Sequence, residues 1–449
     1  MTGNCGMSPW PIGEAAAAWE KACMGTNAVI LIGLGTIREK VMGDADRAPS
    51  PAELARMKEM IAQGMAEGAV GISSGLQYVP GRFASTAELI DLAREAARFG
   101  GLYATHMRSE EEKLLEAVRE AIRIGREAGV RVEVSHLKSS GRPNWGRLPE
   151  AVRLIAEART RGVSITADIY PYNKSATTTL EEIFNVPKDM EPLAGIARRL
   201  GDARTDTAGR TALRLQYTDA LAAALADPPR RERIRKLTEA GVPDRTNWVA
   251  KGGWDNFTIM ASRTRPEFIM KMFRDLAAEL KKPEFDIAAD LFIAEKDDLI
   301  ISLSAMDEAD LRAGLTPPWS MISSDGEAMA AGSSELVHPR NYGTFPRVLA
   351  RYVREEKLLT LEDAVRKMTG LPAQTLRLRD RGFLRAGAKA DLVVFDPRTV
   401  LDRATFTEPH QLAAGIRWVI INGGLSLEDG RLNDRLNGRV LKTADFERR

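Results

Sequence analysis

Short apolar runs alternate with amphipathic stretches from about residue 28 to residue 180. The apolar runs read "AVILIG", "GAVGISSG", "GLYATH", "RVEVSH" and "VSITADIYPY", and each has the length of a buried strand. Between them lie stretches with helical periodicity, such as "STAELIDLAREAARFG", which starts with a capping residue and ends with glycine. This alternation predicts strand–helix units, and therefore a parallel sheet with right-handed connections.

The polar residues that end these runs recur at a regular interval. His106 and His136 are 30 residues apart, and Asp168 follows 32 residues later. One strand, one helix and two loops fit this interval, so we predict an α/β fold of the (β/α)8 TIM-like barrel type. A doubly wound sheet is the alternative that the same pattern allows.

Two later segments break this rhythm. Residues 181–290 are charged and helix-rich without a clear strand, and they are too long for a loop. We interpret them as a helical insertion that is either a lid over the active-site face or a packing element. The strand pattern resumes with "LIISLSAMDEADLR" and "PWSMISSDGE". We therefore expect a barrel over residues 1–380 that contains this insertion.

The pattern of residues changes again from Gly382 onward. The segments "GAKADLVVFDP" and "IRWVIINGGLSLEDGRL" are rich in β-forming residues, with Asn422-Gly423 at the turn of a hairpin. Residues 381–449 are therefore predicted to form a small C-terminal β-module, part of a small β-sandwich domain.

The composition is that of an ordinary globular protein, 44% hydrophobic and 28% charged. The 64 basic residues nearly balance the 62 acidic ones, which does not favour nucleic acid or an anionic membrane as a partner. No stretch approaches the ~18 apolar residues of a membrane helix, and no signal peptide is visible. Cys5 and Cys23 are the only cysteines, which fits a reducing, cytoplasmic compartment.

Three residues have the chemistry and the placement of metal ligands. The motif "GNCG" reads as the end of a strand, with Cys5 facing a site, and His106 and His136 end two further strands. Barrel enzymes place their active sites at these strand ends. Thiolate and imidazole are preferred zinc ligands, and three protein ligands leave one position open for water. The alternative is that each histidine is an ordinary structural residue.

Asp325 follows another apolar run, in "MISSDGE". It is either a turn or helix-cap aspartate, or a carboxylate near the metal. In the second case it takes a proton from water and passes it to the leaving group.

The motifs "GNCG", "GISSGLQYVPG", "YATHMRSE", "VEVSHLK", "ADIYPY", "SSDGE" and "HPRNYGTFPRVL" together resemble those of one family. The chain is similar to the N-acyl-D-amino-acid deacylases (D-aminoacylases) of the amidohydrolase superfamily, from Gly3 to about Leu441. The resemblance implies a Zn²⁺-dependent hydrolase of N-acyl-D-amino acids that releases a carboxylate and a D-amino acid. It also implies that Cys5, His106 and His136 hold the zinc and that Asp325 is the general base and then the acid.

The resemblance further implies residues that bind the small-molecule substrate. They are Tyr78, Lys138 and Arg340, which match positions that hold the free carboxylate, and Tyr170 and Ser175, which line the same pocket. His338 is expected to be structural and to orient the loop that carries Arg340.

One departure from the family pattern changes the expectation for this chain. The family has a His-x-His pair on the first barrel strand, and no His-x-His occurs in this sequence. We therefore expect the first strand to be missing, through a start assigned at an internal methionine. The alternatives to the deacylase function are an amidohydrolase that acts on a cyclic amide or dipeptide, and an inactive truncated fragment. Nothing in the sequence indicates an oligomeric state.

Overall fold

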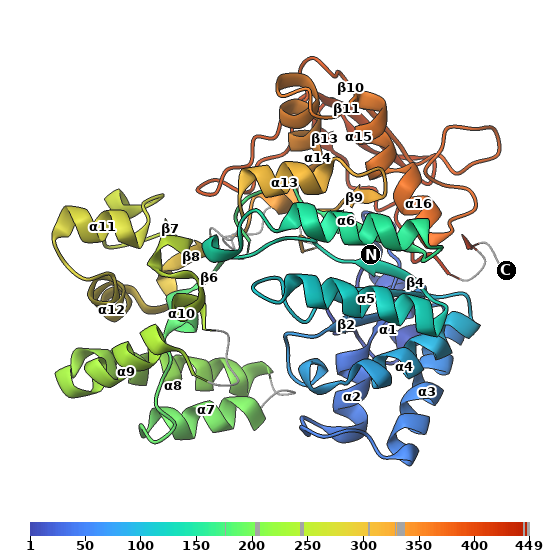
Figure 1. The fold of residues 1–449 in the computed structure, drawn as a ribbon. Helices are drawn as coiled ribbons and strands as arrows, with labels where there is room; N and C mark the ends of the chain where they lie inside the picture. The colour runs from blue at the N-terminus through green and yellow to red at the C-terminus, as the bar shows by residue number, and fades with distance from the viewer. Residues whose placement is uncertain are drawn as a thin grey trace. The chain divides into compact units, whose positions relative to one another are not determined.

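The computed structural model describes residues 1–175, 177–202, 207–242, 247–303, 306–327, 329, 337–442 and 445–446. The chain forms two compact units (Figure 1). The first comprises Met1–Ser140, Asn144–Tyr172 and Asp307–Arg449, and the second comprises Gly141–Pro143 and Asn173–Met306. The predicted helical insertion at 181–290 falls within the second unit, and its role as a lid stays a prediction.

A six-stranded parallel sheet is the centre of the first unit. Its strands are β1 (Leu31–Gly33), β2 (Gly71–Gly75), β3 (Leu102–His106), β4 (Arg131–Val134), β5 (Ile165–Ile169) and β9 (Ser320–Ile322). They pair in the order β1-β2-β3-β4-β5-β9, and each neighbouring pair is parallel. Because this order follows the chain without reversing, the sheet is of the barrel type, whereas a doubly wound sheet would reverse its order.

Helix α1 precedes the sheet in the chain, and the five helices after it, α2 to α6, pack side by side in chain order (Figure 1). Their bounds are α1 Ile12–Ala22, α2 Leu34–Met42, α3 Pro51–Ala66, α4 Thr86–Arg98, α5 Leu114–Ala128 and α6 Leu148–Thr160. The predicted start of α4 is confirmed, because the Ser85 hydroxyl accepts a hydrogen bond from the Glu88 backbone N–H at 3.2 Å. Helix α5 ends at Gly129, which takes the left-handed conformation that glycine tolerates best.

The "GNCG" segment forms a tight turn directly after a strand-like contact. Thr2 bridges Ile30 in parallel, so the residues before the turn continue the sheet beyond β1. Gly3, Cys5 and Gly6 all have positive φ. A side chain on Gly3 would place its Cβ 2.2 Å from the Leu31 carbonyl oxygen, so only glycine fits there. The prediction that Cys5 stands where a strand turns into a loop is confirmed.

The second unit contains a three-stranded antiparallel sheet in the order β6-β8-β7. Its strands are β6 (Thr177–Thr179), β7 (Phe257–Ala261) and β8 (Ile300–Leu303), and its helices are α7 Leu193–Asp202, α8 Thr207–Ala226, α9 Pro228–Ala240, α10 Trp248–Gly252, α11 Phe273–Leu280 and α12 Glu284–Glu295.

Two predictions about this region were wrong. Strand β7 lies inside the segment for which no strand was expected. Strand β8, the run "LIISL", pairs antiparallel with β6 and β7 rather than joining the barrel. A short apolar run signals a strand but carries no information on the direction of its partner.

The rest of the first unit holds a second sheet. Helices α13 (Glu308–Leu315), α14 (Arg340–Arg347), α15 (Leu361–Met368) and α16 (Gly370–Leu376) precede it, with a π-helical turn at Val348–Glu355. Its antiparallel strands are β10 (Leu392–Phe395), β11 (Ile416–Ile421), β12 (Gly424–Glu428) and β13 (Arg431–Leu432). Asn422 and Gly423 both have positive φ, as the predicted hairpin turn requires.

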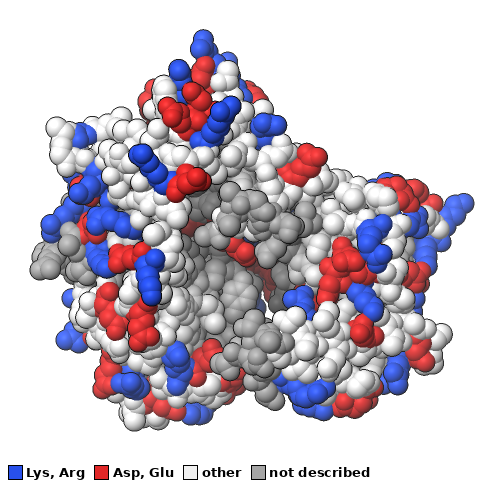
Figure 2. All heavy atoms as spheres, turned by 180° about the vertical axis from the view of Figure 1, so that it is seen from behind, with Lys and Arg blue, Asp and Glu red and all other residues white. Residues whose placement is uncertain are grey.

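The surface carries charges of both signs. On the face seen in Figure 2, basic and acidic side chains are interspersed. No helix in the described part of the chain is long and apolar enough to span a membrane.

Candidate metal centre

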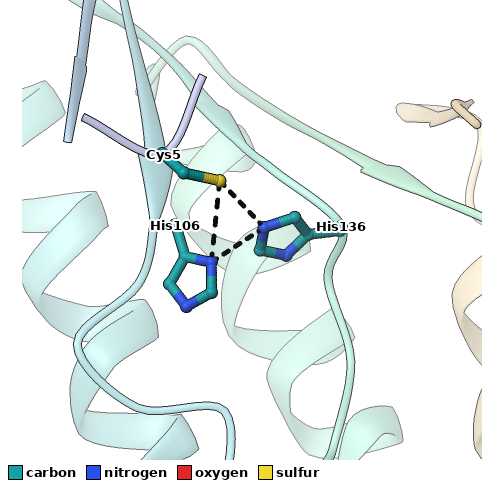
Figure 3. Close-up of side chains that lie close together, drawn as sticks. All are labelled: Cys5, His106 and His136. Atoms are coloured by element: carbon teal, nitrogen blue, oxygen red, sulfur yellow. Dashed lines mark hydrogen bonds between the residues drawn. The ribbon is translucent and has the colours of Figure 1, made fainter. Parts of the chain in front are cut away.

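Three side chains from distant parts of the sequence converge at the carboxyl ends of the parallel strands (Figure 3). The Cys5 Sγ lies 3.7 Å from His106 Nδ1 and 3.5 Å from His136 Nε2, and the two imidazole nitrogens are 2.9 Å apart. Both histidines are buried, and Cys5 is half-buried. The structure therefore brings together the three residues that the sequence predicted as ligands.

The separations between these donor atoms suit one metal ion. A tetrahedral zinc with bonds of about 2.3 Å to sulfur and 2.0–2.1 Å to nitrogen holds such donors about 3.6 Å (S to N) and 3.3 Å (N to N) apart. The two S–N distances match, and the N–N distance is about 0.4 Å short. One thiol and two imidazoles are also the donor types that zinc prefers. The donor set fits zinc.

Neighbouring strand ends fix the two histidines. His106 is the last residue of β3, and His136 follows β4 by two residues, with a positive φ. The Asp168 carboxylate, on β5, accepts hydrogen bonds from the His136 backbone N–H at 2.9 Å and from the Ser323 hydroxyl. Asp168 therefore ties the ends of β4, β5 and β9 together beside the ligands.

Burial and neighbouring charges shift the pKa values of the two histidines in opposite directions. Burial lowers the pKa of His106 to about 3, which leaves its ring neutral, as a metal ligand must be. Burial and the charge of Lys138 also lower the pKa of His136, but Glu110 and the Cys5 sulfur raise it by more, so the net shift is upward. The carboxylate of Glu110, 2.9 Å from Nδ1, thus favours positive charge on the His136 ring.

A buried ion pair lies behind His136. The Lys138 ammonium donates to Glu110 Oε1 at 2.7 Å and to the His136 backbone carbonyl at 3.0 Å, and its Nζ lies 2.9 Å from His136 Nδ1. Lys138 is 7% exposed and Glu110 is 5% exposed. Lys138 is thus fully engaged with protein groups, and its predicted role in binding a substrate carboxylate stays a prediction.

Asp325 and Arg340 form a second ion pair. Arg340 Nη1 lies 2.8 Å from Asp325 Oδ2, and the guanidinium carbon lies 4.8 Å from the centre of the Tyr170 ring. Asp325 is close enough for its negative charge to raise the pKa of Lys138 and to oppose the effect of burial on His106. The predicted proton-transfer residue therefore belongs to the same electrostatic environment as the ligands.

The remaining predicted site residues take different places. The Tyr78 ring centre is 4.8 Å from that of His106, and Tyr78 is 48% exposed. His338 is buried, and its Nδ1 accepts the Arg340 backbone N–H at 3.0 Å, which is the orienting contact expected of it. Ser175 belongs to the second unit, where its N–H donates to the Leu303 carbonyl, and its role as a pocket residue stays a prediction.

Sequence reasoning missed two buried carboxyl groups near the three converging side chains, those of Glu110 and Glu133. Burial and the nearby negative charge of Asp168 raise the pKa of Glu133, whose Oε2 accepts a hydrogen bond from the Ser135 hydroxyl at 2.8 Å. Glu110 could have been suspected, because it lies in the same "THMRSE" stretch as His106. Nothing in the pattern distinguishes it from Glu111 and Glu112, which follow it and are less buried.

Comparison with known proteins identifies the family of this chain. The model of the amidohydrolase family matches residues 301–425. The D-aminoacylase of Alcaligenes xylosoxydans xylosoxydans is 34% identical over an alignment of 464 positions, gaps included, which covers 98% of this chain and 80% of that protein. The N-acyl-D-glutamate deacylase of the same organism is 33% identical over an alignment of 445 positions, which covers 94% of this chain and 76% of that protein.

A solved structure extends the likeness to the fold. The N-acyl-D-glutamate deacylase of Bordetella bronchiseptica, in complex with zinc and a phosphonate mimic of the reaction's tetrahedral intermediate, superposes with a TM-score of 0.70 at 32% identity. The match covers 98% of this chain and 82% of that one. Since sequence identity and fold agree over nearly the whole chain, the family resemblance of the motifs is confirmed: the chain belongs to the D-aminoacylase family of amidohydrolases.

Proposed function

We propose that this protein is a zinc-dependent hydrolase that cleaves the amide bond of N-acyl-D-amino acids to a carboxylate and a D-amino acid. The observation that carries the proposal is the convergence of the Cys5 sulfur with one nitrogen each of His106 and His136. Family membership supports it, because the relatives named above are a D-aminoacylase and N-acyl-D-glutamate deacylases. A reducing, cytoplasmic setting is part of the proposal, since Cys5 must remain a free thiol to bind metal.

In this proposal Cys5, His106 and His136 hold one zinc ion. When bound there, zinc acts as a Lewis acid toward the acyl carbonyl and the attacking water. Asp325 removes a proton from that water and delivers it to the leaving nitrogen, because an amine leaves poorly unless it is protonated.

Arg340 is the proposed reader of the substrate carboxylate. A guanidinium binds a carboxylate through two parallel hydrogen bonds, which orients the substrate as well as attracting it. Arg340 is paired with Asp325 in this structure. A substrate carboxylate that engages Arg340 therefore competes with Asp325 for the cation and releases Asp325 for proton transfer. Tyr78 and Tyr170 are proposed to line the substrate pocket beside Arg340.

The test is hydrolysis by the purified, zinc-loaded protein, with N-acetyl-D-amino acids, their L-enantiomers and a hydantoin as substrates. We expect turnover of the D-amides only. The Asp325→Asn variant should lose about 100- to 10,000-fold in kcat and retain its zinc, because a proton carrier contributes about that factor. Faster turnover of the hydantoin would favour a cyclic-amide hydrolase. Full zinc occupancy without turnover of any amide would favour an inactive chain.

A further inference from the structure

Glu110 is a buried carboxylate with no assigned role beside the metal centre. It lies four residues beyond His106, in the loop that leaves β3. Its Oε1 is 2.7 Å from the Lys138 ammonium and 2.9 Å from His136 Nδ1. The carboxylate therefore contacts the nitrogen of His136 that points away from Cys5.

His136 Nδ1 has two competing neighbours at equal distance. The Lys138 Nζ and Glu110 Oε1 are both 2.9 Å away. The ammonium is a donor and requires an unprotonated Nδ1, whereas the carboxylate is an acceptor and requires a proton on Nδ1. A neutral imidazole carries one proton, on one nitrogen or the other. If Lys138 donates to Nδ1, the proton of the ring lies on Nε2. If Nδ1 carries the proton, it donates to Glu110.

This choice decides whether His136 can bind a metal ion. Its Nε2 is the nitrogen that faces Cys5 and His106, and only an unprotonated Nε2 has a lone pair for the metal. We propose that Glu110 is a positioning residue that keeps the proton of His136 on Nδ1 and so makes Nε2 a metal ligand. Lys138 is then the buried cation that pairs with the Glu110 carboxylate, at 2.7 Å.

His106 lacks an equivalent support. Its Nδ1 faces the other two donors, and its Nε2 is buried without a hydrogen-bond partner among the described residues. The effect of Glu110 should therefore act on one ligand. A carboxylate behind a metal-bound histidine contributes about 10- to 100-fold to metal affinity in other proteins.

The first measurement is zinc affinity, determined by competition with a chelator. Glu110→Gln should bind zinc at least tenfold more weakly than the wild type, because Lys138 then donates to Nδ1 unopposed. Lys138→Met should weaken binding less, since the carboxylate still accepts from Nδ1. The double variant should bind more tightly than Glu110→Gln alone, because the competing donor is gone. If the two changes only damaged the structure, their effects would add, and the double variant would bind zinc more weakly than either single variant.

The matched control is Glu120→Gln. Glu120 is another carboxylate of the same unit that pairs with a cation, Arg108, at 3.0 Å, and among the described residues no hydrogen bond or ion pair joins it to Cys5, His106 or His136. The zinc affinity of the Glu120→Gln variant should equal that of the wild type. A Glu110→Gln variant that folds and binds zinc within twofold of the wild type would overturn the proposal, as would a double variant no tighter than the single one.

A second measurement needs no variant of Glu110. The chain has only four histidines, so ¹⁵N-histidine labelling gives a spectrum in which the tautomer of each ring can be read. We expect His136 of the zinc-loaded protein to carry its proton on Nδ1, and a proton on Nε2 would refute the inference. The inference rests on the proposed zinc site, but the two fail differently. A wild-type protein without zinc affinity overturns both, whereas intact zinc binding in Glu110→Gln overturns this inference alone.

Discussion

The position of Cys5 depends on a glycine that sequence comparison alone would not connect to it. Gly75 ends β2, beside His106 of β3, and a Cβ added there would lie 2.0 Å from the Cys5 carbonyl oxygen. An ordinary contact between such atoms is about 3.3 Å. Gly75→Ala must therefore move the Cys5 backbone by about 1.3 Å or distort β2.

The consequence for metal binding follows from the tolerance of metal–ligand bonds. These bond lengths vary by only about 0.2 Å, so a displacement of this size removes the sulfur from the site unless the loop rearranges. We expect Gly75→Ala to bind zinc at least tenfold more weakly. Overpacking should also lower the free energy of unfolding by about 1–3 kcal/mol.

Chelator competition measures the zinc affinity, and denaturant unfolding in the presence of chelator measures the stability without metal. Gly25→Ala is the control, because the nearest atom to its added Cβ is Leu436 Cδ2 at 3.8 Å, an ordinary contact. A folded Gly75→Ala protein with the zinc affinity of the wild type would refute the reasoning, since Cys5 would then not need its present position.

Three further predictions concern the ligands, the substrate and the fold. Cys5→Ala should lose zinc, and wild-type occupancy should fall at acidic pH because the thiolate ligand must be deprotonated; equal zinc contents in both proteins would exclude Cys5 as a ligand. Arg340→Lys should raise KM for an N-acyl-D-amino acid but change KM little for its neutral amide, because lysine keeps the charge and loses the two parallel hydrogen bonds to a carboxylate. Equal effects on KM for both substrates would indicate a structural role. Arg38→Met leaves the buried Glu88 carboxylate, now 2.5 Å from Arg38, without its cation. Denaturant unfolding should show a loss of about 3–5 kcal/mol, largely recovered when Glu88 is also replaced by leucine.

The parts of the fold that sequence could predict are those with a local signal. The alternation of apolar runs and amphipathic stretches located β1 to β5, and the capping signal of Ser85 or Thr86 located the start of α4, where the structure shows Ser85 as the cap. The ends of these strands then placed Cys5, His106 and His136 at one edge of the sheet, because carboxyl ends of parallel strands lie together.

The parts that could not be predicted depend on contacts between distant residues. The run that forms β8 is as apolar as a barrel strand, and only its antiparallel partners β6 and β7 distinguish it. Glu110 resembles its exposed neighbours in sequence, and its role becomes visible only when Lys138 and His136 are placed beside it. Burial of a charge is a property of the folded surroundings, which local composition does not encode.

The family resemblance assigns both Lys138 and Arg340 to the substrate carboxylate, but the contacts of these two cations differ. The ammonium of Lys138 is engaged by Glu110 and by the carbonyl of His136, so binding a substrate would cost it a buried ion pair. Arg340 instead pairs with the partly exposed Asp325, and its Nε has no hydrogen-bond partner among the described residues. A carboxylate can therefore bind Arg340 without breaking the support of a metal ligand. Substitution of Arg340 should accordingly act on KM, whereas substitution of Lys138 should act through Glu110 on the metal centre.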